Sequence, residues 1–196
     1  METVFDILTG IGLACAAGIR PFLPGLVAGA FAAANLTIDF GGADLAFLEE
    51  PVWLLALVVA LLVAVILQRR LGAERLESGL PAAILGGIAI GVAALLFAGA
   101  LSDHSDTWWP GLLGGLACAF LAERATHDLM RRTRSRLDPE AREALVVYAD
   151  GASLLLAVLA VLAPPLSLVA LGFLVWLLLG GRRRKGEKYA GLRILR

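Results

Sequence analysis

The basic residues of this chain are confined to three short segments that alternate with long apolar runs. Of its 17 Lys and Arg residues, 16 lie within 69–75, 124–142 and 182–196, and the remaining one is Arg20. Membrane proteins with several spans gather their basic residues in the cytoplasmic connections in this way. The pattern therefore predicts an all-α, polytopic membrane helix bundle. It also makes Arg20 a candidate functional residue, because an arginine amid apolar sequence is costly in a membrane.

The composition agrees with lipid as the surrounding solvent. Hydrophobic residues make up 59% of the 196 residues, and the mean hydropathy is +0.83. A domain in water would not carry that much apolar surface. The formal net charge of zero hides a segregation of charge, because 36–50 is acidic without a basic residue, whereas 182–196 is strongly basic. No nucleic-acid partner is expected, because the basic tail lacks interleaved aromatic residues and a folded module.

Four segments are long enough to cross a bilayer, which takes about 20 helical residues. Pro51, Pro81 and Pro165 lie at or near their expected starts, where the missing N–H of proline costs nothing. The segments are 51–70, 80–101, 144–163 and 165–181. A fifth helix is expected from Pro110 to about Leu129, and its charged end would continue into the cytoplasm.

The first 40 residues allow two arrangements. The apolar segments 4–19 and 22–34 are both short and meet at Arg20, which prolines follow. In one arrangement both segments cross the membrane, with Arg20 at the inner interface. In the other they form a re-entrant hairpin with Arg20 near mid-depth, which requires that other helices bury the broken backbone. The segment 21–40 is just long enough to span, and this favours two crossings.

The connections then alternate from side to side, with the N-terminus outside and the C-terminus inside. This predicts seven transmembrane helices, or six plus an N-terminal re-entrant hairpin. Residues 1–181 would form a single transmembrane domain, and 182–196 a basic cytoplasmic tail that contacts anionic lipid. Small residues spaced by four favour close helix packing within the bundle or across a homo-oligomer. They are Gly10, Ala14 and Gly18, Gly25 and Gly29, Gly87 and Gly91, and Gly111 and Gly115.

Residues 10–29, GIGLACAAGIRPFLPGLVAG, resemble the N-terminal signature of a small integral-membrane family of bacteria, domain of unknown function 4126. The family's Arg-x-Phe-Leu-Pro pattern falls here on Arg20 through Pro24. The resemblance covers essentially the whole chain and is also strong at 146–153 and 180–196. It implies a multi-pass protein of the bacterial cytoplasmic (inner) membrane. It implies no activity, because the family has none established.

Arg20 and Asp150 are the main candidates for a binding site. The guanidinium group stays charged and offers forked donors to phosphate or carboxylate, and Pro21 and Pro24 would leave nearby backbone groups unpaired, as in transporter sites built from broken helices. Asp150 is expected roughly 10 Å deep, with Ser153 on the same helix face. A carboxylate there must pair with a cation such as Arg20, bind an ion or take up a proton. The simpler alternative is that Arg20 reaches lipid phosphates from a helix end.

Glu123 and His127 form a second candidate group. Their spacing of four places them on one helix face, where they could relay protons near the cytoplasmic mouth. An ordinary helix end, whose charges reach water, is the simpler interpretation.

These residues favour a small transporter or lipid translocator with an intramembrane site for an anionic group, either a small solute or a lipid headgroup. The alternative is a non-transporting membrane scaffold or assembly subunit, in which Arg20 and Asp150 only pair two helices. An enzyme is not expected, because the sequence has no metal triad, no nucleophile with its base and no phosphate-cradling loop. We therefore assign no catalytic residue, metal or cofactor.

Overall fold

The chain folds into helices only, as far as the structure describes it. The computed structural model describes residues 2–34, 36, 38, 40, 45–72, 79–102, 108–134 and 137–190, without the side chains of 139, 140, 143 and 181–190. These residues form seven α-helices, one short 3-10 helix and no strand. The helices are α1 (Glu2–Ile19), α2 (Phe22–Ala33), η1 (Ala46–Glu49), α3 (Pro51–Leu71), α5 (Gly79–Ser102), α6 (Trp109–Arg134), α7 (Pro139–Leu162) and α8 (Leu166–Ala190). The prediction of an all-α bundle is confirmed.

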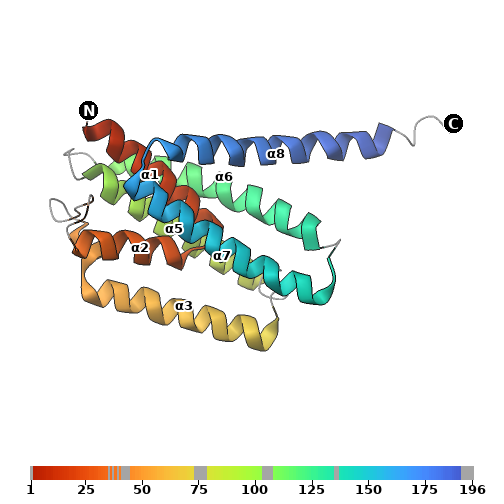
Figure 1. The fold of residues 1–196 in the computed structure, drawn as a ribbon, viewed down its shortest axis with the longest axis horizontal. Helices are drawn as coiled ribbons and strands as arrows, with labels where there is room; N and C mark the ends of the chain where they lie inside the picture. Colours follow the sequence, from red (N-terminus) through yellow and green to blue (C-terminus); the bar gives the residue numbers. More distant parts are fainter. Residues whose placement is uncertain are drawn as a thin grey trace.

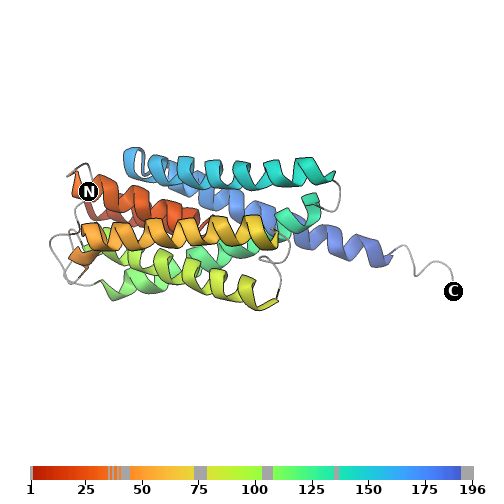
Figure 2. The ribbon, with the colours of Figure 1, turned by 90° about the horizontal axis from the view of Figure 1, so that it is seen from below.

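The helices lie alongside one another, and the chain passes back and forth between the two ends of the bundle (Figures 1 and 2). The N-terminus lies at one end. At the other end, α8 continues beyond the neighbouring helices (Figure 1). Helix α8 therefore extends past the predicted boundary at residue 181 and into the basic tail, whose side chains lie outside the described part of the chain.

The ends of α3 show how the sequence sets the helix boundaries. Glu50 is extended (φ −65°, ψ 140°), and Pro51 follows it in the first turn, where proline needs no N–H partner. The helix stops at Gly72, whose φ of 82° suits a residue without Cβ. Arg69 and Arg70 occupy the last turn, where positive charge complements the helix dipole. The observed bounds agree with the predicted span 51–70.

Helix α1 is the central element of the bundle. It packs against α2, α5, α6, α7 and α8, and its stretch from Leu13 to Ala17 is fully buried. Small side chains allow this close packing. A Cβ added to Gly18 would come within 2.6 Å of the carbonyl oxygen of Ala119 on α6. The backbones of α1 and α6 are therefore almost in contact.

Helices α5 and α6 approach each other just as closely. A Cβ on Gly111 would lie 2.7 Å from the Cα of Ala98, and a Cβ on Gly115 would lie 2.6 Å from the Cα of Ala94. The predicted packing through small residues is thus present on this face of α6. By contrast, nothing lies within 4 Å of a Cβ built on Gly87 or Gly91. That pair faces open space on the outside of the described fold.

Several helices are long and apolar enough to cross a membrane. Four meet this criterion by length and composition: α1, α3, α5 and the part of α7 from Ala144 to Leu162. Helix α2 and the segment Leu166–Gly180 of α8 are apolar but shorter. Only 6% of the most apolar stretch of α3 is buried in the fold, so this helix exposes hydrophobic side chains everywhere except on the stripe that faces the bundle. These features indicate a membrane protein.

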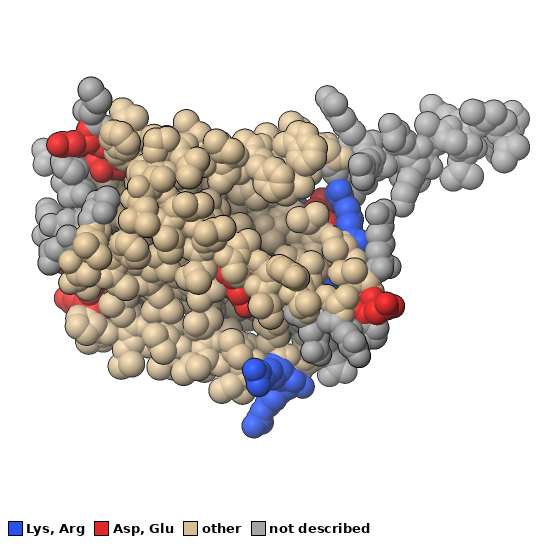
Figure 3. Space-filling model, viewed as in Figure 1, with Lys and Arg blue, Asp and Glu red and all other residues tan. Residues whose placement is uncertain are grey.

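Charged side chains gather at the two ends of the bundle. Figure 3 shows acidic side chains at the end where α1 and α3 begin, basic side chains together with some acidic ones toward the opposite end, and a mostly uncharged surface between them. Arg69 and Arg70 end α3, and Arg131, Arg132 and Arg134 end α6. A small acidic area interrupts the middle of the uncharged face in Figure 3.

The turn between α1 and α2 lies inside the bundle. In Figure 1 the two helices meet well short of the far ends of α3, α6 and α7. Arg20 and Pro21 at this turn line the same cavity as Leu61, which is near the middle of α3. The α1–α2 hairpin is therefore shorter than the helices around it, and this difference creates the space described next.

Candidate functional site

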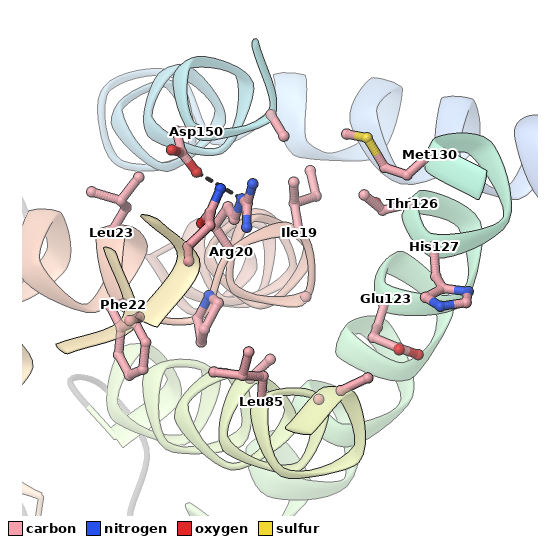
Figure 4. A pocket seen from close by; sticks show the side chains of 18 of the residues that line it. Ile19, Arg20, Phe22, Leu23, Leu85, Glu123, Thr126, His127, Met130 and Asp150 are labelled. Carbon is pink, nitrogen blue, oxygen red and sulfur yellow. Dashed lines mark ion pairs between the residues drawn. The ribbon is translucent and has the colours of Figure 1, made fainter. Parts of the chain in front are cut away.

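A cavity of about 160 Å³ lies at the tip of the α1–α2 hairpin. Residues of α1, α2, α3, α5, α6 and α7 and of the hairpin turn line it, and Figure 4 shows most of their side chains. The lining residues are Gly18, Ile19, Arg20, Pro21, Phe22 and Leu23 of the hairpin, Leu61, Ala64, Val65 and Gln68 of α3, Ala82, Leu85, Gly86 and Ala89 of α5, Glu123, Thr126, His127 and Met130 of α6, and Ala149 and Asp150 of α7. The volume suits several waters or one small polar group, and it is smaller than the pockets that enclose drug-sized ligands.

The cavity exists because the hairpin ends while its neighbours continue. The α3 residues in the wall follow the spacing i, i+3, i+4, i+7, so one stripe of this helix faces the space. The α3 residues in the wall run from the midpoint of that helix toward its end, the α6 residues lie in the second half of α6, and the α5 residues lie in the first half of α5. The cavity is thus in the half of the bundle nearest Arg69 and Arg131.

Arg20 and Asp150 form an ion pair at the wall of this cavity. The Nε atom of Arg20 lies 2.6 Å from Oδ1 of Asp150, and the side chains are 23% and 45% exposed. The Arg20 Nε–H is buried and has no acceptor in hydrogen-bonding geometry within the described part of the chain, so the contact is an ion pair set by charge and distance. A guanidinium group carries five N–H donors in a planar fork, and Asp150 engages one edge of it. Figure 4 shows the pair at the hairpin tip, beneath α7.

Ser153 fixes α7 against the end of α1. It is fully buried, and its hydroxyl donates a hydrogen bond of 2.9 Å to the carbonyl oxygen of Ala16. Ser153 does not line the cavity, although it shares a face of α7 with Asp150. Pro21 lies in the cavity wall, whereas Pro24 is fully buried in α2. The structure therefore brings Arg20, Asp150 and Pro21 together and gives Ser153 a supporting position.

Glu123 and His127 line the cavity from α6, across from the ion pair (Figure 4). A Cβ on Gly86 of α5 would lie 3.6 Å from Oε1 of Glu123, so this carboxylate reaches the α5–α6 seam. Among the described residues, it forms an ion pair with the exposed Arg124, at 4.0 Å. No hydrogen bond joins Glu123 to His127 among the residues that the structure describes. Any proton relay between them would need a bridging water.

One family model matches nearly the whole chain. The family model described as Domain of unknown function (DUF4126) matches residues 7–184. The chain belongs to this family. Every residue that lines the cavity falls within the matched range, so the site is built from the family's own part of the chain. No curated protein and no solved structure matches the chain.

Two polar residues of the cavity were not anticipated from the sequence. Gln68 comes from α3 and Thr126 from α6, and both lie in the wall. Gln68 is the first polar residue after a long apolar run, which is a signal that could have drawn attention to it. In the described part of the chain, no group of three or more His, Cys, Asp or Glu residues could hold a metal ion.

Cys15 and Cys118 meet at the packed interface of α1 and α6. Both are free cysteines, and Cys118 packs against the buried apolar cluster to which Cys15 belongs. The sequence alone places them in two separate apolar helices and cannot show that they are neighbours. Here the packing confirms the pairing of these two helices and lies outside the cavity wall.

Phe40 and Leu48, which precede α3 in the chain, close the end of the bundle opposite the arginines. Phe40 is fully buried and packs on Gly99 of α5, where an added Cβ would come within 2.8 Å of the ring. Leu48 of η1 is 1% exposed and approaches the same glycine. Together with the buried half of α1, these side chains separate the cavity from that end of the molecule.

Proposed function

We propose that this protein is a small transporter or lipid translocator of the bacterial cytoplasmic membrane, and that it receives an anionic group in the cavity at Arg20. The proposal depends on one observation: a permanently charged arginine lies beside a cavity in the interior of an apolar bundle. A charge in such a place is costly unless it has a role. The guanidinium fork suits phosphate and carboxylate groups.

We further propose that the bundle crosses the membrane along its long axis, with the N-terminus outside and the C-terminus inside. The arginine-rich end would face the cytoplasm, in accord with the positive-inside rule. The α1–α2 hairpin would enter from the outside and turn within the membrane. Because α1 and α2 would form this hairpin and not cross, five helices would cross, namely α3 and α5 to α8. This is one fewer than the sequence count of six plus a hairpin.

In this orientation the cavity would be reached from the inside and closed from the outside. Its wall belongs to the half of the bundle nearest the arginines, whereas Phe40 and Leu48 pack the opposite end. A carrier must expose its site to one side at a time. The structure would then correspond to an inward-facing state, and opening the other side would require Phe40 and Leu48 to separate from Gly99 of α5.

The experiment is reconstitution of the purified protein into liposomes. One arm measures uptake of labelled inorganic phosphate and of labelled lactate. A second arm measures transbilayer movement of fluorescent phosphatidylglycerol. We expect activity in one arm and its loss in Arg20→Gln, whereas Arg70→Gln, at the exposed end of α3, should retain it. Activity no higher than in protein-free liposomes in both arms would remove the proposal.

The ion pair between Arg20 and Asp150 also fits the alternative function as a non-transporting scaffold, because it joins the hairpin to α7. A pair with only this role would lose stability in either single neutral variant, Arg20→Gln or Asp150→Asn. The double variant would regain it, since no unpaired charge would remain. No solute or lipid would move in any of the four proteins. Measuring thermal unfolding and flux on the same preparations separates the two functions.

A further inference from the structure

The charges around the cavity limit what the site can hold. Among the described residues of the wall, Arg20 is the one permanent cation. Two carboxylate residues belong to the wall: Asp150 beside Arg20, and Glu123 on α6, whose carboxylate extends toward the α5–α6 seam (Figure 4). His127 is the remaining titratable group of the wall. A single permanent positive charge can balance one negative charge, so a ligand with one negative charge matches the site best.

The positive charge of Arg20 is already balanced by Asp150 in the structure. The two groups are 2.6 Å apart, and Asp150 is open enough to exchange protons with water in the cavity. An anion that approached Arg20 would come close to the ionised Asp150 carboxylate as well. Two negative charges within about 4 Å repel strongly away from bulk water. The anion and the ionised carboxylate therefore compete for one guanidinium group.

We propose that the site binds its monoanion together with one proton, and that the proton is held by Asp150. The chemical class of the ligand is a monoanionic phosphodiester or carboxylate. This inference rests on the proposed function of the cavity. In this step a proton from the bulk solution, carried as hydronium and relayed through water in the cavity, is transferred to a carboxylate oxygen of Asp150, which becomes a neutral acid and leaves neutral water behind. Arg20 then pairs with the anion, and the bound state carries no added net charge.

The neighbouring elements support Asp150 as the proton acceptor. The hairpin tip presents Arg20 to it, and the α3 and α5 stretches of the wall carry no titratable side chain, with Gln68 as their one polar residue. Helix α6 presents Glu123 and His127 across the cavity. Of the two carboxylates, only Asp150 contacts Arg20. Its protonation, and not that of Glu123, therefore releases the guanidinium group for a ligand.

Protonation of Asp150 also adds a donor to the site. A protonated carboxyl group has an O–H that can donate to an oxygen of the bound anion. The neutral acid and the guanidinium fork would then hold the anion from two sides. Because proton and anion enter together, the bound form is electroneutral, which lowers the cost of carrying it through an apolar bundle.

The test measures protons and ligand on the same protein in lipid nanodiscs of phosphatidylcholine. The probes are labelled dimethyl phosphate, a phosphodiester that remains a monoanion between pH 5 and 9, and a labelled short-chain phosphatidylglycerol. A pH indicator in weakly buffered solution counts protons taken up at saturation. We expect one proton per bound anion. We also expect the affinity to fall tenfold for each unit of pH increase above the range in which Asp150 is protonated.

Asp150→Asn imitates the protonated state with a neutral side chain. It should bind either probe with an affinity independent of pH and without proton uptake. Arg20→Gln should bind neither probe. Glu123→Gln and His127→Asn should keep the pH slope of the wild type. If Asp150→Asn does not fold, the slope and proton count of the wild type and of these two variants still test the proposal.

The outcomes separate this inference from the function on which it rests. Binding of either probe without proton uptake overturns proton coupling and leaves the anion site intact. Loss of the pH slope in Glu123→Gln or His127→Asn, with the slope retained in Asp150→Asn, also overturns it. No binding of either probe by the wild type overturns the proposed function itself. If dimethyl phosphate binds with proton uptake, a free anion is a sufficient ligand. If phosphatidylglycerol binds and dimethyl phosphate does not, the ligand is a lipid headgroup.

Discussion

The hydroxyl of Ser153 and the backbone N–H of Arg20 donate to the same acceptor, the carbonyl oxygen of Ala16, at 2.9 and 3.0 Å. One bond closes the last turn of α1, and the other joins this turn to α7. Asp150 lies about one turn before Ser153 on α7. The shared carbonyl thus fixes the position of the carboxylate relative to the arginine and accounts for the contact between them.

Replacing Ser153 with alanine tests this arrangement. Ala16 keeps its bond from Arg20, so no acceptor is left unpaired, and we expect a stability loss of only about 0.5–1.5 kcal/mol. Ser102→Ala is the matched control, because this buried serine donates to Gly99 within its own helix. Both variants should lose similar stability in thermal unfolding, but only Ser153→Ala should reduce flux. Equal flux in the two variants would show that the Ser153 bond does not position the site.

The helices and their order follow from hydropathy and length, which a sequence shows directly. The span predicted at 51–70, for example, agrees with α3 to within a residue. Arg20 and Asp150 could be singled out because charged groups are rare in apolar helices. The distance of 2.6 Å between Arg20 Nε and Asp150 Oδ1 could not be predicted from the sequence, because it depends on how α1 and α7 pack.

Other features of the site depend wholly on lateral packing. Gln68 lines the cavity because the α1–α2 hairpin ends before it reaches this level of α3. Hydropathy does not show how far along the bundle axis a helix hairpin extends. Ser153 was expected to line the site on the basis of helix periodicity, but its hydroxyl is turned toward α1. Periodicity gives the face of a helix and does not identify the neighbour that covers it. The packing of Cys118 against the cluster of Cys15 is unreadable from sequence for the same reason.

Gly18→Ala should be costly, because its new Cβ would lie 2.6 Å from the carbonyl oxygen of Ala119, a backbone atom that cannot turn aside. We expect a loss of about 1–3 kcal/mol, as for overpacked interiors. Gly87→Ala is the control on an open helix face, where alanine should be neutral or add up to about 1 kcal/mol through helix propensity. Thermal unfolding in detergent measures both. A Gly18→Ala protein as stable as Gly87→Ala would contradict the close approach of α1 and α6.

The packing of Cys118 against the cluster of Cys15 should allow the two thiols to be joined. Mild oxidation with copper–phenanthroline is expected to remove both free thiols within one chain, as judged by thiol labelling after denaturation. Cys118→Ala should keep one free thiol under the same treatment. Two thiols that remain free in the wild type, or a covalent dimer in place of the internal link, would show that α1 and α6 do not pack as described.

The cavity should hold water and open toward the cytoplasm, and cysteine labelling tests both points. In a variant with Cys15 and Cys118 replaced by alanine, Ala64→Cys places a thiol in the cavity wall, and Val63→Cys places one on the exposed apolar face of α3. Maleimides react with the thiolate, which forms in water and not in lipid. An impermeant maleimide should therefore label Ala64→Cys and spare Val63→Cys. Labelling should occur in inside-out vesicles and not in intact cells. Equal labelling of the two positions would mean that α3 is not set in lipid, and labelling of Ala64→Cys only in intact cells would reverse the proposed orientation.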